Sequence, residues 1–355
     1  MEKVMSRKLI TISTIMTLMS TSIMADAPNV AADIAPIHSL VSKVMDGVGE
    51  PKLVIQSGAS PHGYRLRPSE AKALQDANLI FWMGEELTPW LDGAIDTLAS
   101  NATVTSLLDQ EGILLHDFRE GALFEAHDHS AHDDHDDHDD HDDHKDHDDH
   151  DDHKDHDDHD DHDDHDDHKD HDDHDDHDDH DDHGHGAHDP HAWLSPENAK
   201  LWLNIIASKL SVADPENAAT YFTNAAAGQA EIEDMVAEVS ATLKPVQGGK
   251  FVVFHDAYQY FENDFDFYAS GAISLGDASD PSPARIAEIQ RRIQEEGIQC
   301  VLAEPQYKKG LVATVMEGSN ATASVIDPLG ADIKPGPKLY TQLIKNMAKI
   351  LRNCL

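Results

Sequence analysis

Short apolar runs alternate with helix-like segments in the first third of the chain. Between residue 26 and about residue 119, an apolar run at 51–57 is followed by a helix-like segment at 68–76 and by a second apolar run at 79–84. Strands that alternate with helices in this way form parallel sheets, because each helix returns the chain to the start of the next strand. We therefore expect an N-terminal lobe of the α/β class.

The same alternation returns from residue 249 onward. Apolar runs at 250–254, 299–303 and 324–327 predict strands, and the segment at 283–296 predicts a helix. At 355 residues the chain is longer than one hydrophobic core usually serves. The expected fold is thus α/β, with two parallel-sheet lobes.

A long helix is predicted between the two lobes. Asp214 and Pro215 form a typical helix start, with aspartate as N-cap and proline in the first turn, and Pro245 ends the helical pattern. The apolar residues of the pattern are Ala218, Phe222, Ala225, Ile232, Val236, Val239 and Leu243. About 29 helical residues extend roughly 44 Å, which is enough for a rigid strut along both lobes.

The first residues have the pattern of a secretory signal peptide. Lys3, Arg7 and Lys8 precede an apolar stretch from residue 9 to about residue 24, and Ala25 is the expected cleavage point. No later stretch approaches the eighteen or so apolar residues needed to cross a bilayer, so we expect an exported protein without membrane insertion. The expected organisation is a signal peptide at 1–25, an N-terminal lobe at 26–213, a linking helix at 214–245 and a C-terminal lobe at 246–355.

A periodic tract of histidine and aspartate interrupts the first lobe. From residue 132 to residue 183 every third residue is histidine, and 31 aspartates and three lysines fill the positions between, so the tract carries −28 of the formal net charge of −43. The tract has no apolar residue and cannot build a core, so we expect a disordered insertion at about 126–188. Its histidines are His132, His135, His138, His141, His144, His147, His150, His153, His156, His159, His162, His165, His168, His171, His174, His177, His180 and His183.

The composition of the tract points to cations as partners. Imidazole suits Zn²⁺, Cu²⁺ and Ni²⁺, and histidine is largely neutral near pH 7, so the tract predicts many weak auxiliary metal sites. The alternative is a polar spacer without a metal role. An acidic surface of this kind repels phosphate backbones and anionic membranes, so nucleic acid and lipid are poor partners.

The two cysteines of the chain are Cys300 and Cys354. In an exported protein a single pair favours a disulfide, and closing a loop of about 55 residues stabilises the fold by roughly 4 kcal/mol in the chain-entropy model. Two free thiols, or a metal bound by cysteine, remain the alternatives.

Three histidines outside the tract are candidate ligands of one tight site. His62 and His255 each follow a predicted strand directly, and His191 lies in a loop before the helix expected from Ser195. In open parallel sheets, ligands bind beyond the carboxyl ends of strands, so residues distant in sequence meet in a cleft. Three imidazoles there are typical zinc ligands, and Asp327 or a water molecule would supply the fourth.

Other polar residues are expected to be structural. His38 lies on a helix-like stretch and His116 at the end of a segment, and neither has a partner motif. Glu304 is expected to line the cleft rather than to bind the metal. The chain has no His-Glu-x-x-His, Gly-x-Ser-x-Gly or phosphate-loop motif, which weakens the case for an enzyme.

Five segments together resemble the periplasmic zinc-binding proteins of ABC importers, the metal-binding cluster A-I solute-binding family. They are Ser-Pro-His-Gly-Tyr-Arg-Leu-Arg-Pro at 60–68, Asp-Pro-His-Ala-Trp-Leu-Ser-Pro at 189–196, Phe-His-Asp-Ala-Tyr at 254–258, Glu-Pro-Gln at 304–306 and Asp-Pro-Leu-Gly at 327–330. The resemblance implies two α/β lobes joined by a long backbone helix, with metal bound between them. Many family members carry a charged, histidine-rich loop where the tract lies here.

The resemblance also implies roles for single residues and for partners. Manganese-specific relatives have a carboxylate at the third histidine, so His255 favours zinc. The family's terminal disulfide corresponds to Cys300 and Cys354. The implied partner is an inner-membrane zinc ABC permease, and we expect the chain to be a monomer.

The leading hypothesis is a solute-binding protein that captures Zn²⁺ and delivers it to an importer, with the tract as an auxiliary zinc-collecting or sensing segment. A zinc storage or buffering protein is the first alternative, in which the tract is the purpose and the lobes are a scaffold. A zinc-dependent hydrolase is the second, because three histidines and a water also describe a catalytic site.

Overall fold

The protein is described by a computed structural model that covers residues 27–119, 188–274, 281–307 and 309–355. The predicted signal peptide at 1–25 and the eighteen tract histidines lie outside the described residues. Within the described part of the chain, no helix is both long enough and apolar enough to cross a bilayer.

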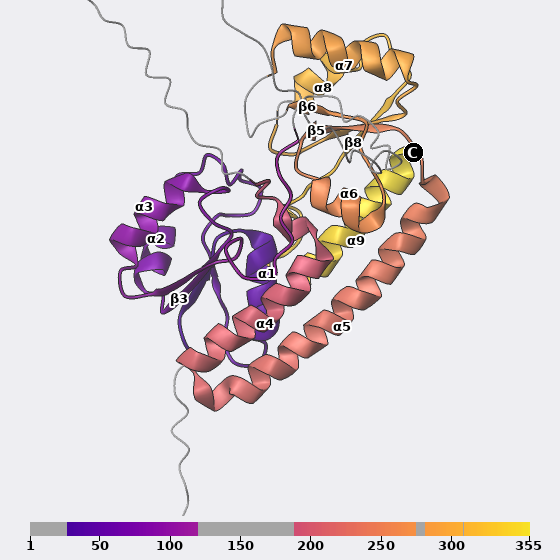
Figure 1. The fold of residues 1–355 in the computed structure, drawn as a ribbon. Helices are drawn as coiled ribbons and strands as arrows, with labels where there is room; N and C mark the ends of the chain where they lie inside the picture. Colours follow the sequence, from indigo (N-terminus) through magenta and orange to yellow (C-terminus); the bar gives the residue numbers. More distant parts are fainter. Residues whose placement is uncertain (1–26, 120–187, 275–280, 308) are drawn as a thin grey trace, which may run out of the picture. The chain divides into compact units, whose positions relative to one another are not determined.

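Four short parallel strands form the sheet of the N-terminal lobe (Figure 1). In sheet order they are β2 (Lys52–Leu53), β1 (Val30–Ala32), β3 (Leu79–Trp82) and β4 (Thr103–Ser106). The helices of this lobe are α1 (Ala35–Val44), α2 (Pro68–Gln75) and α3 (Pro89–Leu98). Every residue of β1 and β3 is buried, as their uninterrupted apolar sequences require in a sheet covered on both faces.

The C-terminal lobe repeats this architecture. In sheet order its parallel strands are β6 (Ala272–Ser274), β5 (Phe251–His255), β7 (Cys300–Ala303) and β8 (Thr322–Val325). Its helices are α6 (Gln259–Phe265), α7 (Pro283–Glu295), α8 (Lys309–Val315) and α9 (Leu339–Cys354). The predicted fold class, two parallel-sheet α/β lobes, is confirmed.

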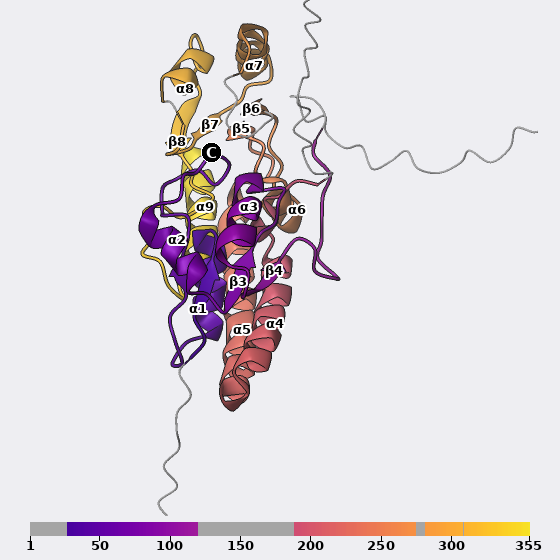
Figure 2. The ribbon, with the colours of Figure 1, turned by 90° about the vertical axis from the view of Figure 1, so that its left-hand side faces the viewer.

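The predicted long helix is α5 (Ala218–Leu243), which contacts elements of both lobes. It packs against α1 and α4 (Pro196–Ala213) and against α9, and α4 and α5 lie side by side in both Figure 1 and Figure 2. Its start differs from the prediction, because residues Pro215–Asn217 form a 3₁₀ turn. Asp214 caps no backbone amide there, since its carboxylate accepts hydrogen bonds from Asn217 Nδ2 and Tyr221 Oη.

The buried side of α5 differs from the predicted stripe at three positions, because Ala218 and Val236 are only partly buried and Phe222 is 50 % exposed. Its buried residues recur every three or four positions and are Tyr221, Ala225, Gly228, Ile232, Met235, Val239 and Leu243. Ion pairs of 2.5 Å also join Lys43 on α1 to Glu231 and Lys345 on α9 to Glu238. Such exposed pairs contribute at most about 1 kcal/mol each, so the buried stripe carries most of the attachment.

Buried hydrogen bonds hold the segment before α4 against the C-terminal lobe. Trp193 Nε1 donates to the carbonyl of Pro328 at 2.8 Å, and Tyr340 Oη on α9 donates to the carbonyl of Trp193 at 3.0 Å. Both aromatic side chains are almost completely buried. Because a buried polar group left without its partner costs about 1–3 kcal/mol, these contacts fix this segment closely.

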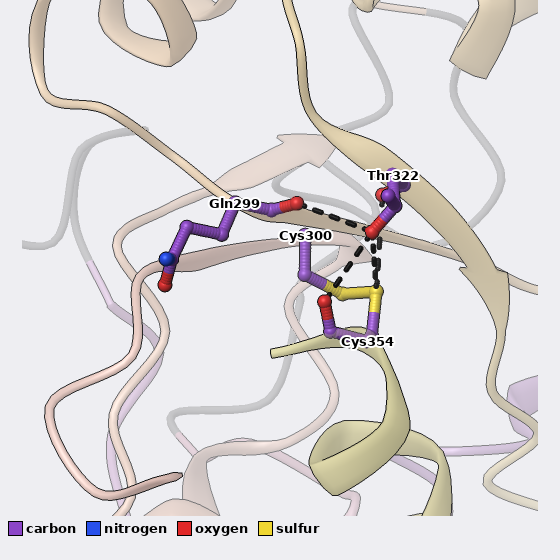
Figure 3. The surroundings of a disulfide bond; sticks show 4 residues. All are labelled: Gln299, Cys300, Thr322 and Cys354. Atoms are coloured by element: carbon purple, nitrogen blue, oxygen red, sulfur yellow. Dashed lines mark hydrogen bonds between the residues drawn. A yellow bond between two sulfur atoms is a disulfide. The ribbon is translucent and has the colours of Figure 1, made fainter.

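A disulfide joins Cys300, at the start of β7, to Cys354, at the end of α9 (Figure 3). Thr322 Oγ1 donates to the carbonyls of Gln299 and Cys354 beside it, at 3.2 and 3.3 Å. The predicted disulfide is therefore present. The alternative of free thiols or cysteine ligation is not supported, because both cysteines are used in the bond.

Candidate metal centre

The structure brings His62, His191 and His255 together. One nitrogen from each ring lies within 4.8 Å of the other two. His255 is the last residue of β5, and His191 directly precedes the short 3₁₀ helix η1 (Ala192–Leu194), which leads into α4. His191 and His255 are buried, and His62 is half-buried.

The position of His62 differs from the sequence prediction. Strand β2 ends at Leu53, so His62 lies in a loop rather than directly after a strand. The loop is held by Trp90 of α3, whose Nε1 donates to the carbonyl of Pro61 at 2.7 Å. Tyr64 Oη also donates to Glu70 of α2 at 2.8 Å. The loop is thus fixed by side chains of two neighbouring helices.

Two carboxylates orient two of the imidazoles. His191 Nδ1 lies 2.6 Å from Asp189 Oδ1, and His255 Nδ1 lies 2.5 Å from Glu304 Oε1. Asp189 also accepts from the backbone amide of His191 at 3.0 Å. Pairs of this kind set the tautomer and the ring orientation of metal-binding histidines. The sequence alone indicated no role for Asp189 and only a place in the cleft for Glu304.

These hydrogen bonds make the Nε2 atoms of both rings suitable metal donors. An ionised carboxylate can only accept, so in each neutral ring Nδ1 carries the proton and Nε2 carries the lone pair. The Nε2 atoms of His191 and His255 lie 3.4 Å apart. Zinc–nitrogen bonds of about 2.05 Å in a tetrahedral site place two ligand nitrogens about 3.3 Å apart. The observed spacing therefore fits one shared zinc ion.

Aromatic and apolar groups surround the three imidazoles. The pocket is lined by Trp193, Tyr307 and Leu329 among others, and Tyr307 packs near His255 with ring centroids 5.4 Å apart. Burial, followed by the nearby Glu304 carboxylate, raises the pKa of Tyr258 well above its ordinary value, so this hydroxyl stays protonated. The site thus combines polar side chains, among them the three imidazoles, Glu304 and Gln306, with aromatic and apolar neighbours.

Asp327 is not part of the three-histidine cluster. Its Oδ1 accepts from the backbone amide of Leu329 at 2.9 Å, and its Oδ2 accepts from the backbone amide of Ala331. The carboxylate thereby shapes the turn after β8, which also presents Leu329 to the pocket.

The two histidines expected to be structural have structural contacts. His38 Nε2 lies 3.1 Å from the carbonyl of Pro51, and burial lowers the pKa of His38. The ring of His116 packs against Tyr260, with centroids 4.7 Å apart, and its Nε2 lies 3.2 Å from Asn263 Nδ2.

Comparison with known proteins gives concordant matches along the chain. A family model described as zinc-uptake complex component A, periplasmic, ZnuA, matches residues 30–354. The high-affinity zinc uptake system protein ZnuA of Brucella abortus (strain 2308) is 46% identical over 335 residues, which cover 94% of each chain. The protein of the same name from Paracoccus denitrificans is 44% identical over 332 residues, which cover 93% of each chain. A crystal structure of ZnuA matches in fold, with a TM-score of 0.67, 19% identity, and coverage of 93% of this chain and 99% of that one.

Proposed function

Because the chain belongs to the ZnuA family of periplasmic zinc-uptake components, we propose that it captures Zn²⁺ with His62, His191 and His255 and delivers the ion to an ABC-type importer in the inner membrane. The observation that carries the proposal is the convergence of three imidazoles, two of them oriented by carboxylates, at a spacing that fits a tetrahedral ion. A site with nitrogen donors alone also favours zinc over the harder cations magnesium, calcium and manganese.

Water is the proposed fourth ligand. Ser60 Oγ and Gln306 Oε1 are buried, line the pocket, and have no hydrogen-bond partner among the described residues. A zinc-bound water has two hydrogens to donate, and both of these atoms can accept one. The oxygens of Asp327 are engaged by backbone amides instead.

The surroundings of the site support uptake rather than hydrolysis. A zinc hydrolase needs a general base near the metal-bound water. The two carboxylates closest to the imidazoles, Asp189 and Glu304, each accept from an Nδ1 atom and orient a ring. The relatives are likewise named for zinc uptake. The ion is therefore the cargo, and the chain turns nothing over.

The His/Asp tract is proposed as an auxiliary segment that collects zinc or senses surplus zinc. Because the sequence of the tract contains no apolar residue, we expect each of its sites to bind zinc more weakly than the three-histidine site. We expect the tract to release zinc as pH falls through about 6 to 7, while the three-histidine site keeps its ion to lower pH.

Calorimetry on full-length and tract-deleted protein at about pH 7.5 and about pH 5.5 tests this role. Several additional weak sites should appear only in the full-length protein at the higher pH. Equal stoichiometry in both proteins would reduce the tract to a spacer. If tight one-to-one binding disappeared with the tract, the buffering alternative would replace the uptake proposal.

Growth in zinc-depleted medium tests delivery. Cells that lack their own copy of this gene should regain growth when they export the wild-type chain, and His255→Ala should not restore it. Comparable periplasmic amounts of both chains, measured by immunoblot, are the control. Export itself tests the proposed signal peptide at 1–25, because the mature chain should begin near residue 26.

A further inference from the structure

The side chain of Arg119 binds two buried carboxylates of the C-terminal lobe. Its Nε lies 3.0 and 2.9 Å from the two carboxylate oxygens of Asp256, and its Nη1 donates to Glu262 Oε2 at 2.6 Å. The side chain of Arg119 is 13% exposed, and those of Asp256 and Glu262 are 7% and 1% exposed. A guanidinium holding two carboxylates in this way restrains both, because its donors form a rigid planar fork.

The two carboxylates lie on either side of the connection between β5, which ends at His255, and α6. Asp256 directly follows His255, and Glu262 lies on α6. Between them the chain turns tightly, with the amide of Ala257 donating to the carbonyl of His255 at 3.0 Å. Arg119 therefore holds in place the segment that follows His255.

The segment that carries Arg119 also holds the segment that carries His191. We call residues 116–119 the strap. The carbonyl of His116 accepts from the amide of Asp189 at 2.8 Å, and Asp117 Oδ1 lies 2.8 Å from His188 Nδ1 in an antiparallel bridge.

Tyr260 of α6 forms hydrogen bonds with both the strap and the segment that carries His191. Its hydroxyl accepts from the amide of His116 at 3.1 Å and donates to the carbonyl of Asp189 at 2.7 Å. Asp189 in turn orients His191. The strap is thus bonded to the segments that carry two of the three imidazoles.

We propose that Arg119 is a positioning residue for zinc capture: through the strap, it fixes the spacing between His191 and His255 without touching the ion. This inference rests on the proposed zinc site. An imidazole pair held at 3.4 Å binds zinc without first moving its segments, so loosening the strap adds an ordering cost to binding.

A purely electrostatic role for Arg119 predicts the opposite sign. Removing a cation, while leaving Asp256 and Glu262 in place, would make the region more negative and would tighten the binding of a divalent cation. Positioning predicts weaker binding. The direction of the change therefore separates the two roles.

The test is zinc affinity of the full-length chain, measured by competition with a tight zinc chelator so that only the strongest site is loaded. Arg119→Met should weaken binding by about tenfold or more, as is typical when an outer residue of a metal site is lost. Arg119→Lys should bind with intermediate affinity, because an ammonium supplies charge without the fork.

Two further variants keep the test decisive. Arg119→Met combined with Asp256→Asn and Glu262→Gln leaves no unpaired buried charge, and it should bind zinc more weakly than the Asp256→Asn, Glu262→Gln double variant, even if Arg119→Met alone does not fold. Lys43→Met removes an ion pair between α1 and α5 and should leave affinity unchanged.

Unchanged or tighter binding in the folded Arg119 variants would overturn the inference, as would an equal loss of affinity in Lys43→Met. If the proposed zinc site is wrong, the result is different: His255→Ala should then bind zinc, in competition with the chelator, as tightly as the wild-type chain does.

Discussion

The Nε2 atoms of His191 and His255 lie 3.4 Å apart although 64 positions separate the two residues in the chain. Their Nδ1 atoms face Asp189 and Glu304, so each ring, when neutral, carries its lone pair on Nε2. A cation bound between the two Nε2 atoms would stabilise their close approach.

Glu304→Gln tests the role of the carboxylate that orients His255. The amide can still accept through its oxygen, but it loses the charge that strengthens this hydrogen bond and raises ligand basicity. We expect zinc affinity to fall by about 10- to 100-fold without loss of stoichiometry. The matched control is Glu295→Gln, at an exposed ion pair with Arg291 on α7, which should bind as the wild type does. Equal zinc affinity in Glu304→Gln and Glu295→Gln would show that Glu304 does not assist metal binding by His255.

Asp327→Asn tests whether a carboxylate completes the site. Because the oxygens of Asp327 accept from backbone amides, the substitution should lower stability while affinity falls by less than about tenfold. Loss of a ligand would instead weaken binding by orders of magnitude. Chelator competition distinguishes the two outcomes, and a loss as large as that of His255→Ala would identify Asp327 as the fourth ligand.

Reduction of the disulfide should destabilise the C-terminal lobe without releasing the metal. The bond links positions 54 apart in sequence, and in the chain-entropy model a loop of this length is worth about 4 kcal/mol. The melting temperature should therefore fall when Cys300 and Cys354 are both replaced by serine. The variant should still bind one zinc ion at the three-histidine site. Loss of that ion when the cysteines are replaced would show that zinc binding depends on the disulfide.

Asp33 should make stability depend on pH. Its buried carboxylate accepts from the amides of Ile34 and Met83, yet burial raises its pKa from 3.8 to about 7. A folded pKa above the unfolded value means that the stabilising contribution is complete below the unfolded pKa and is lost as pH rises toward 7. When the pH is raised from about 5 to about 8, the free energy of unfolding of the zinc-free protein, measured by denaturant titration, should fall more for the wild type than for Asp33→Asn. Parallel losses in the two proteins would contradict this assignment.

Strands such as Leu79–Trp82 and Cys300–Ala303 were predictable because buried parallel strands are uninterrupted apolar runs. Periodicity alone could not decide which of two neighbouring aromatic residues near the start of α5 is buried. Phe222 fits the apolar stripe as well as Tyr221 does, but Tyr221 also donates a hydrogen bond to Asp214 that the pattern does not encode.

The three histidines were recognisable from their local motifs, but the groups that orient them were not equally visible. Asp189 lies two positions before His191 and could have been suggested by that spacing. Glu304 is 49 positions from His255, and only the neighbouring strands β5 and β7 bring them together. The strap contacts of Arg119 have no local signal either, because their partners lie 137 and 143 positions away.

The central claim is tested most directly by calorimetric zinc titration of tract-deleted protein and of its His62→Ala, His191→Ala and His255→Ala variants. We predict one tight zinc ion per wild-type chain. Each variant should bind more weakly by orders of magnitude, because it loses one of three nitrogen donors, and should keep the wild-type circular dichroism spectrum. Tight one-to-one binding that survives in all three variants would contradict the assignment of the site.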